Sequence, residues 1–327
     1  MDKLLTISIA AYNVSSYIAD TLNSLIVDKD CLNALDIIVV NDGSKDDTLD
    51  IATNIAKNYP NSIRVIDKPN SGYGSTVNTS IEIAKGKYFR LLDGDDLFES
   101  ENVREYLEFL KTADSKMILS PYYTFYQSST NTIHKDLKPA DINNPIVPTI
   151  TIETNTLKKV YNRLSENILY TDAEYTFNAI LAASSICTID IPTYIYRLGR
   201  DGQSVSLESI KKNYTHHITV SNRICSIYEG ISNNKLNTLS ETQINLSNNK
   251  MTSIIHDAFQ AIALNGTSKL DVLKDYDQQL KVNYPRCYEI SNKSKKVYFI
   301  RLLNFKFYAL YCRIIRYLFI KKNPHSI

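Results

Sequence analysis

Three carboxylates lie within four consecutive residues, at Asp93, Asp95 and Asp96, with one glycine between the first two. Carboxylates held this close repel one another, which costs stability unless hydrogen bonds or a cation compensate. Their hard oxygen atoms suit Mg²⁺ or Mn²⁺, which bind through one or two carboxylates while phosphate oxygens complete the shell. The alternative is a solvent-exposed acidic turn that begins the helix expected near Glu99.

The elements that must position this cluster follow from hydrophobic patterning. Short apolar, β-branched runs predict strands that are buried on both faces of a parallel sheet, and helical patterns separate them. Ser44 and Ser75 are candidate N-caps for two of these helices. The alternation predicts a doubly wound α/β domain. The expected strands are residues 4–10, 36–40, 63–66 and 88–92, and the expected helices are residues 15–27, 46–57 and 75–85.

Polar residues follow three of the predicted strands. Tyr12 comes directly after the first strand, Asp42 follows the second, and the carboxylate cluster follows the fourth. The carboxyl ends of parallel strands meet at one edge of a sheet, where ligands bind. We therefore expect these residues to form the floor of one cleft, in which the Tyr12 ring can stack on a base.

The second half of the chain changes character. The alternation breaks after residues 117–120, and a Tyr-, Thr- and Asn-rich stretch with four prolines predicts an irregular excursion to about residue 151. A helical pattern over 155–183 precedes short strands at 186–189 and 194–197, and residues 210–280 have a helical, polar pattern. We place a domain boundary near Leu207, which gives domains at 1–206 and 207–327.

Composition narrows the class of protein. The 327 residues have an ordinary globular composition and a formal charge of +2, which gives no reason to expect nucleic-acid binding. The five cysteines are scattered without the paired spacing of a zinc site or a disulfide framework, so we expect a reducing compartment. The first residues run directly into a strand pattern rather than a signal peptide. A cytoplasmic location follows.

Four stretches, taken together, carry a family resemblance. They are residues 8–13, 40–48, 70–78 and 84–88, and the last leads into the carboxylate cluster. In this order they resemble the family 2 glycosyltransferases of bacterial type. The resemblance implies the GT-A fold, a Rossmann-like nucleotide-diphospho-sugar transferase domain, with a donor half at about 1–120 and an acceptor half at about 121–206. It also implies an inverting reaction.

The resemblance assigns roles to the residues of the cleft. Ala11 and Tyr12 would line the base and Asp42 would accept a hydrogen bond from it, as the matching residue does with uracil in family members. A UDP-sugar donor is therefore implied. Asp93 would hold the ribose hydroxyls, and Asp95 would bind the metal that bridges the two phosphates.

Two further features near the cleft are less specific. Asp96 would lie behind the metal ligand rather than on the metal. Asn70 and Gly72 belong to a loop whose glycines allow the backbone to approach the donor closely, although a plain turn before a helix would use the same residues.

The chemistry also needs a base, because an acceptor hydroxyl that attacks the anomeric carbon must lose its proton. Residues 170–175 resemble the acidic motif that supplies this base in the family, and Asp172 is the match by position. Thr171 stands where many members have Glu, so Glu174 stays open as the alternative. An acidic first turn that is stabilised by the helix dipole would have the same composition.

A basic segment follows the last predicted strand. Arg197 or Arg200 can neutralise a departing diphosphate, because a guanidinium fork matches phosphate oxygens. A surface turn is the alternative for this segment.

Residues 295–322 are aromatic and basic and contain no acid. At about 100° per residue, Lys295, Lys306 and Arg313 fall on one line of a helix. This profile predicts an amphipathic helix in a membrane interface that is attracted to anionic lipid, and the alternative is a helix packed on protein or in a dimer. The opposite, apolar side consists of Val297, Ile300, Tyr308, Tyr311, Ile315 and Leu318.

The sequence therefore predicts a metal-dependent hexosyl- or N-acetylhexosaminyltransferase that acts in assembly of cell-surface polysaccharide, glycolipid or glycoprotein glycans. Its acceptor would be a glycan or a lipid- or protein-linked group, and a homo-oligomer is compatible. The sequence contains no Trp, so the Gln-x-x-Arg-Trp motif of processive relatives is absent and transfer of a single sugar is favoured. A nucleotidyltransferase would want a Gly-rich basic loop after the first strand, where residues 11–14 read Ala-Tyr-Asn-Val. A non-catalytic nucleotide-sugar-binding subunit is the second alternative.

Overall fold

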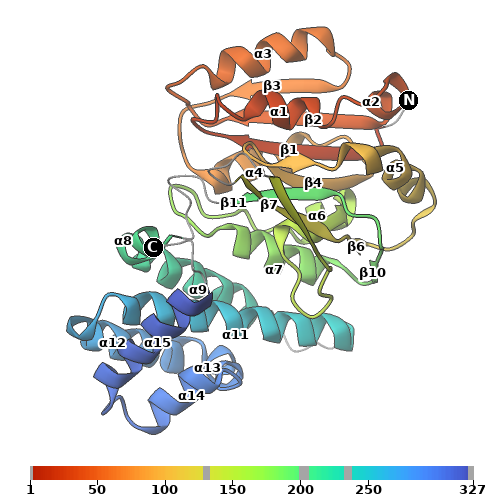
Figure 1. The fold of residues 1–327 in the computed structure, drawn as a ribbon. Helices are drawn as coiled ribbons and strands as arrows, with labels where there is room; N and C mark the ends of the chain where they lie inside the picture. Colours follow the sequence, from red (N-terminus) through yellow and green to blue (C-terminus); the bar gives the residue numbers. More distant parts are fainter. Residues whose placement is uncertain (1–2, 128–132, 199–205, 232–237, 323–327) are drawn as a thin grey trace. The chain divides into compact units, whose positions relative to one another are not determined.

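The computed structural model describes residues 3–127, 133–198, 206–231 and 238–322 (Figure 1). The chain divides into two compact units. The sheet unit consists of Met1–Ile168 and Asn178–Leu198, and the helical unit consists of Leu169–Phe177 and Gly199–Ile327. The sequence placed one boundary between residues 206 and 207, whereas this division starts the C-terminal part of the helical unit at Gly199 and also assigns Leu169–Phe177 to that unit.

The sheet unit is built on a seven-stranded sheet with the order β10-β6-β9-β4-β1-β2-β3. The four strands β4, β1, β2 and β3 are all parallel, whereas β9 is antiparallel to both of its neighbours, β4 and β6. Because helices cover the sheet, β1 and β2 are buried along almost their whole length. The strands are β1 Leu5–Ala11, β2 Leu35–Asn41, β3 Ile63–Asp67, β4 Tyr88–Asp93, β6 Met117–Leu119, β9 Ile150–Glu153 and β10 Ile186–Thr188.

The helices of the sheet unit confirm the predicted alternation but correct its details. The first predicted helix is shorter, and a second helix follows because the Asp28 carboxylate caps its N-terminus. Both predicted N-caps are wrong. Asp47 precedes the second predicted helix, and Gly72 precedes the third, so that Ser75 lies inside it. The helices are α1 Ile18–Asn23, α2 Lys29–Ala34, α3 Thr48–Asn58, α4 Tyr73–Ile83, α5 Val103–Thr112 and α6 Thr154–Val160.

The stretch that was predicted to be irregular forms part of a second, four-stranded sheet with the order β5-β11-β7-β8. Its Tyr, Thr and Phe residues favour strands, and Pro139, Pro145 and Pro148 fall beyond the strand ends, where they remove no ladder hydrogen bond. The prediction weighted these prolines too heavily. The strands are β5 Leu97–Phe98, β7 Tyr122–Gln127, β8 Ile133–Lys138 and β11 Tyr194–Leu198.

The helical unit confirms the predicted helical C-terminal region. The long helix α11 lies at its centre and packs against α9, α12, α13 and α15. Ser240 and Gln243 form a reciprocal capping box at its N-terminus. The helices are α8 Leu207–Lys212, α9 Tyr214–Glu229, α11 Glu241–Leu264, α12 Leu270–Asn283, α13 Pro285–Ser291, α14 Lys295–Leu302 and α15 Tyr308–Lys322, and α7 Asp172–Ala182 begins in this unit.

Residues 295–322 form two helices rather than one. Asn304 and Phe305 have positive φ angles of 46° and 60°, which end α14 before α15 begins. The apolar side predicted from the sequence is mostly buried, and α14 and α15 pack against α11. No helix in the described parts of the chain is long and apolar enough to span a bilayer. The buried positions are Val297, Ile300, Tyr308, Tyr311 and Ile315, whereas Leu318 is exposed.

Candidate functional site

The strand register brings the predicted cleft residues to one edge of the large sheet. Ala10 of β1 pairs with Asp93 of β4, and Ala11 pairs with Asn41 of β2. The three segments that leave these strands therefore lie side by side, as the sequence predicted. Tyr12 follows β1 at this edge and is about half exposed, at 49%. Its ring is accessible for stacking.

The loops at this edge are locked to one another by hydrogen bonds. Asn13 has a positive φ of 51°, and its backbone N–H donates to Ser44 Oγ at 3.0 Å while its side chain accepts from the Lys45 N–H at 2.8 Å. Asp46 accepts hydrogen bonds from Ser15 and Thr48. Burial alone would raise the pKa of Asp46, but the hydrogen bonds from Thr48 and Ser15 lower it to about 2. The ionised Asp46 carboxylate therefore ties the loop after β1, at Ser15, to the start of α3, at Thr48.

Asp42 is almost fully buried, with 3% of its surface exposed. Its Oδ1 accepts from the Lys68 ammonium at 2.7 Å and from the Ser71 N–H at 3.0 Å, and its Oδ2 accepts from the Gly72 N–H at 2.8 Å. The Ser75 hydroxyl lies 3.4 Å from Oδ1. This carboxylate therefore holds the loop around Asn70 and Gly72, and Oδ2 retains capacity for a second donor.

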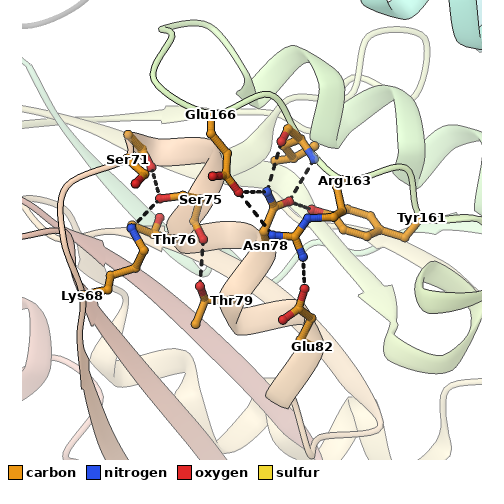
Figure 2. A network of polar contacts seen from close by, with 12 residues as sticks. Lys68, Ser71, Ser75, Thr76, Asn78, Thr79, Glu82, Tyr161, Arg163 and Glu166 are labelled. Atoms are coloured by element: carbon orange, nitrogen blue, oxygen red, sulfur yellow. Dashed lines mark hydrogen bonds and ion pairs between the residues drawn. The ribbon is translucent and has the colours of Figure 1, made fainter.

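The same loop is packed against the segment that follows α6. Gly72 has a φ of 83°, and a Cβ on Gly74 would lie 2.0 Å from the Ser165 carbonyl oxygen. Asn78 of α4 is fully buried against the segment that follows α6: its Nδ2 donates to the Leu164 carbonyl at 3.0 Å and to Glu166 at 3.0 Å (Figure 2). Its Oδ1 accepts from the Leu164 N–H at 2.9 Å. Close backbone approach explains why glycine is needed here.

The carboxylate cluster forms a turn in which Asp95 and Asp96 are buried and Asp93 is partly buried. The Asp96 N–H donates to the Asp93 carbonyl at 3.0 Å, and the Thr21 hydroxyl lies 2.7 Å from the Asp96 carbonyl. Asp95 is 7% exposed and Asp96 is not exposed at all. The alternative of a solvent-exposed acidic turn is therefore wrong. The chain continues into β5 and a short 3₁₀ helix, Ser100–Asn102, before α5 begins.

Asp96 is held by the neighbouring sheet. The Tyr194 hydroxyl donates to Asp96 Oδ2 at 2.5 Å, and the Arg197 N–H donates to Oδ1 at 2.8 Å. Burial raises the pKa of Asp96 well above its usual range, and the negative charges of Asp93 and Asp95 raise it further. The three carboxylates therefore repel one another in the folded protein.

The crowding of three carboxylates into one turn, with Asp95 and Asp96 buried, is the observation that tests the cluster as a cation site. A divalent cation would compensate the charge, and the oxygen-only donor set fits Mg²⁺ or Mn²⁺. In the described parts of the chain, no three His, Cys, Asp or Glu side chains converge as a complete metal site. The residues fit a cation that takes one or two ligands from the protein and the rest from a bound diphosphate.

Arg197 lies against the cluster. Its Nε donates to the Asp95 carbonyl at 2.9 Å, and its guanidinium lies 5.0 Å from the centre of the Tyr17 ring and 5.2 Å from that of Phe125. These contacts position the backbone of Asp95. Arg200, the other basic candidate, lies outside the described residues.

In the helical unit, Asp172 is the first residue of α7 and is exposed, whereas Glu174 is 1% exposed. Two adjacent histidines of α9 hold the segment before it: His216 Nδ1 accepts from the Leu169 N–H at 3.2 Å, and the His217 ring stacks on Tyr170 with 3.8 Å between ring centres. Burial lowers the pKa of both histidines, that of His217 to about 4. They are neutral at physiological pH.

Sequence reasoning missed several residues that shape the site. Lys68 pairs with Asp42, Tyr194 with Asp96, and Asn78 fixes the loop after α6. Two of the three lay in segments that the sequence marked: Asn78 ends the stretch 70–78, and Tyr194 begins the predicted strand 194–197. The pairing itself gave no sequence signal, because its partners are 26 to 98 residues apart.

Comparison with protein families gives one match over much of the chain. The sequence model described as glycosyl transferase family 2 matches residues 6–175. An uncharacterised glycosyltransferase of Mycoplasma pneumoniae is 27% identical over 217 residues, which cover 62% of this chain and 71% of that protein. Chondroitin synthase of Pasteurella multocida is 39% identical over 113 residues, which cover 33% of this chain and only 11% of the synthase.

Solved structures share the fold. TarS of S. aureus (residues 1–349 in complex with UDP-GlcNAc) superimposes with a TM-score of 0.55 and 21% identity, covering 89% of this chain and 92% of that one. A mannosyltransferase of Pyrobaculum calidifontis in complex with GDP-Man and Mn²⁺ gives a TM-score of 0.54 at 10% identity, with 96% and 87% coverage.

Proposed function

Because this chain belongs to glycosyl transferase family 2, and is thus a glycosyltransferase of the GT-A fold, we propose that it transfers one sugar from a UDP-sugar to an acceptor hydroxyl. The observation that carries the proposal is the carboxylate cluster at the carboxyl end of β4, in which Asp95 and Asp96 are buried and Asp93 is partly buried. The transferred group is a hexose or N-acetylhexosamine, and its anomeric carbon inverts, as the family resemblance implies.

Asp95 is the proposed metal ligand and Asp93 the proposed partner of the ribose hydroxyls. The crowding of three carboxylates in one turn supports this assignment, and so does the Mn²⁺ in the complex of the structurally similar mannosyltransferase. When bound, Mg²⁺ or Mn²⁺ neutralises negative charge on the departing diphosphate. Asp96 has a different role: through Tyr194 and Arg197 it fixes the turn that presents Asp95.

The base of the donor is proposed to lie over Ala11 and Tyr12. The exposed Tyr12 ring supports stacking, and the UDP-GlcNAc in the TarS complex supports a uridine nucleotide. Asp42 can accept one hydrogen bond from the base through Oδ2, while its other contacts keep Asn70 and Gly72 beside the donor. Asp42 therefore both shapes and contacts the pocket in this proposal.

Asp172 is the proposed general base. It takes the proton of the acceptor hydroxyl while the acceptor oxygen bonds to the anomeric carbon and the bond from that carbon to the diphosphate oxygen breaks. Its exposure supports this choice over the buried Glu174, because a base must reach the acceptor. The acceptor hydroxyl belongs to a glycan or to a lipid- or protein-linked group of a bacterial cell-surface polymer.

We propose a cytoplasmic enzyme that contacts the inner face of the cell membrane peripherally and that can form homo-oligomers. All five cysteines are free, and four of them, Cys31, Cys225, Cys287 and Cys312, are buried. Reduced cysteines are normal in the cytoplasm and uncommon in exported proteins.

Substitution of Asp95 tests the proposal. Hydrolysis or transfer from a panel of UDP-sugars is measured with Mn²⁺, with Mg²⁺ and with EDTA, for the wild type and Asp95→Ala. We expect metal-dependent turnover in the wild type and a loss of at least about 100-fold in the variant, the size seen when one electrostatic stabiliser is removed. Full activity of Asp95→Ala would refute the proposal.

A further inference from the structure

The helical unit exposes an unusual concentration of large apolar side chains at its C-terminal end. The most exposed of them include Tyr317 at 64%, Leu302 at 62% and Phe307 at 56%. In the described residues, most large hydrophobic side chains with this exposure lie in this one segment. The set, called here the C-terminal apolar face, consists of Tyr298, Phe299, Leu302, Leu303, Phe307, Leu310, Ile314, Tyr317 and Leu318.

This face is distinct from the side that holds α15 to the protein. Tyr308, Tyr311 and Ile315 are buried, and α15 packs on α11. Leu310 and Ile314 lie on the other side of the same helix, because residues four apart share a face. A helix that is apolar on both sides is unusual at a water-exposed position, and a contiguous exposed apolar patch marks an interaction surface.

The charged side chains of the segment that carries the face all have one sign. The last acidic residue of the sequence is Glu289, so the segment that carries the face contains no carboxylate side chain. Several basic side chains within it are exposed, and long basic side chains can lay their stems on apolar surface while the charge reaches out to polar groups. The exposed basic residues are Lys295, Lys306, Arg313, Arg316 and Lys321.

We infer that the C-terminal apolar face binds the surface of an anionic lipid bilayer, with its aromatic and aliphatic side chains inserted at the interface. The basic residues supply the charge complementarity to acidic headgroups. This inference rests on the proposed function for its peripheral membrane contact. It assigns that contact to the exposed side of α14 and α15, which shares only Leu318 with the apolar side that the sequence favoured.

A second copy of the chain is a less suitable partner for the C-terminal apolar face than a lipid bilayer. A two-fold interface brings the same patch of both copies together, so Arg313 and Arg316 would face the same cations with no acidic partner in the segment. A bilayer with acidic lipids supplies the missing negative charge.

Vesicle sedimentation tests the inference with the full chain. Binding is measured to vesicles of phosphatidylcholine alone and to vesicles of phosphatidylcholine with about 30% phosphatidylglycerol, which provide an anionic surface. We expect at least about tenfold tighter binding to the anionic vesicles, weakened by salt. Phe307→Ser/Leu310→Ser/Tyr317→Ser should abolish binding, and Lys306→Gln/Arg313→Gln/Arg316→Gln should remove the preference for anionic lipid.

Val282→Ser is the matched control, because Val282 is 66% exposed on α12, away from this segment in sequence, and should bind like the wild type. Circular dichroism verifies folding, and hydrolysis of a soluble UDP-sugar should be unchanged in every variant, which separates failure of this inference from failure of the proposed function. Two results would overturn the inference: vesicle binding that the serine variant retains, or no vesicle binding together with a dimer in light scattering that the serine variant dissociates.

Discussion

The Tyr194 hydroxyl donates a 2.5 Å hydrogen bond to Asp96, a carboxylate 98 residues earlier in the chain. It thereby fixes the end of β4 to β11 of the second sheet. Burial raises the pKa of Tyr194 well above its usual range, and the charges of Asp93 and Asp96 raise it further. The Tyr194 hydroxyl therefore keeps its proton, and can donate a hydrogen bond, at physiological pH.

Tyr194→Phe should weaken the turn that presents Asp95. The substitution removes a donor from a fully buried carboxylate, which costs about 1–3 kcal/mol. We expect a lower midpoint in urea unfolding and a higher Mn²⁺ concentration for half-maximal activity. Tyr122→Phe, at the paired position on β7, is the control and should leave the metal requirement unchanged. If both variants behave alike, the Tyr194 hydroxyl does not position the cluster.

Asp42→Asn should damage the loop of Asn70 and Gly72, because one of the acceptor oxygens that Lys68 and the loop N–H groups require becomes a donor. We expect a loss of about 1–3 kcal/mol in unfolding free energy and a higher KM for the UDP-sugar. Asp67→Asn, at the end of β3, keeps one carbonyl acceptor for Asn41 and is the matched control. An unchanged KM in Asp42→Asn would show that the loop does not bind the donor.

Gly74→Ala tests the close approach of two backbone segments. Its Cβ would lie 2.0 Å from the Ser165 carbonyl oxygen, so the chain after α6 must move. We expect destabilisation of about 1–3 kcal/mol by urea unfolding. Gly230→Ala, whose Cβ would lie 3.2 Å from the Ser226 carbonyl oxygen, should cost clearly less. Equal stability of the two variants would contradict the packing described for Ser165.

His217 should make stability depend on pH. Burial lowers its pKa to about 4, whereas an unfolded histidine has a pKa of about 6.5. Between these two pH values the unfolded chain binds more protons at His217 than the folded chain does. Neutral His217 therefore contributes on the order of 3 kcal/mol to the unfolding free energy. This contribution is complete above about pH 6.5 and is lost as the pH falls toward 4. His217→Phe keeps a ring against Tyr170 and removes the titration. Its melting temperature should fall less between pH 7 and pH 5 than that of the wild type, and an equal fall would contradict this role.

The sheet edge was predictable because its signals are local. Runs such as 36–40 specify buried strands, and parallel strands must align their carboxyl ends, so Tyr12, Asp42 and Asp93 could be grouped from the amino-acid sequence alone. The pairing of Ala10 with Asp93 agrees with that reasoning.

The parts that were not predictable depend on long-range packing. Nothing local to Asp96 indicates that Tyr194 will cover it, and the Tyr-rich β7 resembled a loop because flanking prolines are strong turn signals. Helix α15 has apolar residues on two opposite sides. Periodicity could identify an apolar side, but it could not show that this side packs on α11 and leaves the other apolar side exposed.

The most direct test of the central claim is the effect of metal on nucleotide binding. The affinity for UDP is measured by isothermal titration calorimetry in Mn²⁺ and in EDTA, for the wild type and for Asp95→Asn. Wild-type protein should bind UDP at least about tenfold more tightly with Mn²⁺, a coupling of about 1.4 kcal/mol, and Asp95→Asn should lose this gain while remaining folded. A gain that Asp95→Asn retains in full would contradict the assignment of Asp95 as the metal ligand.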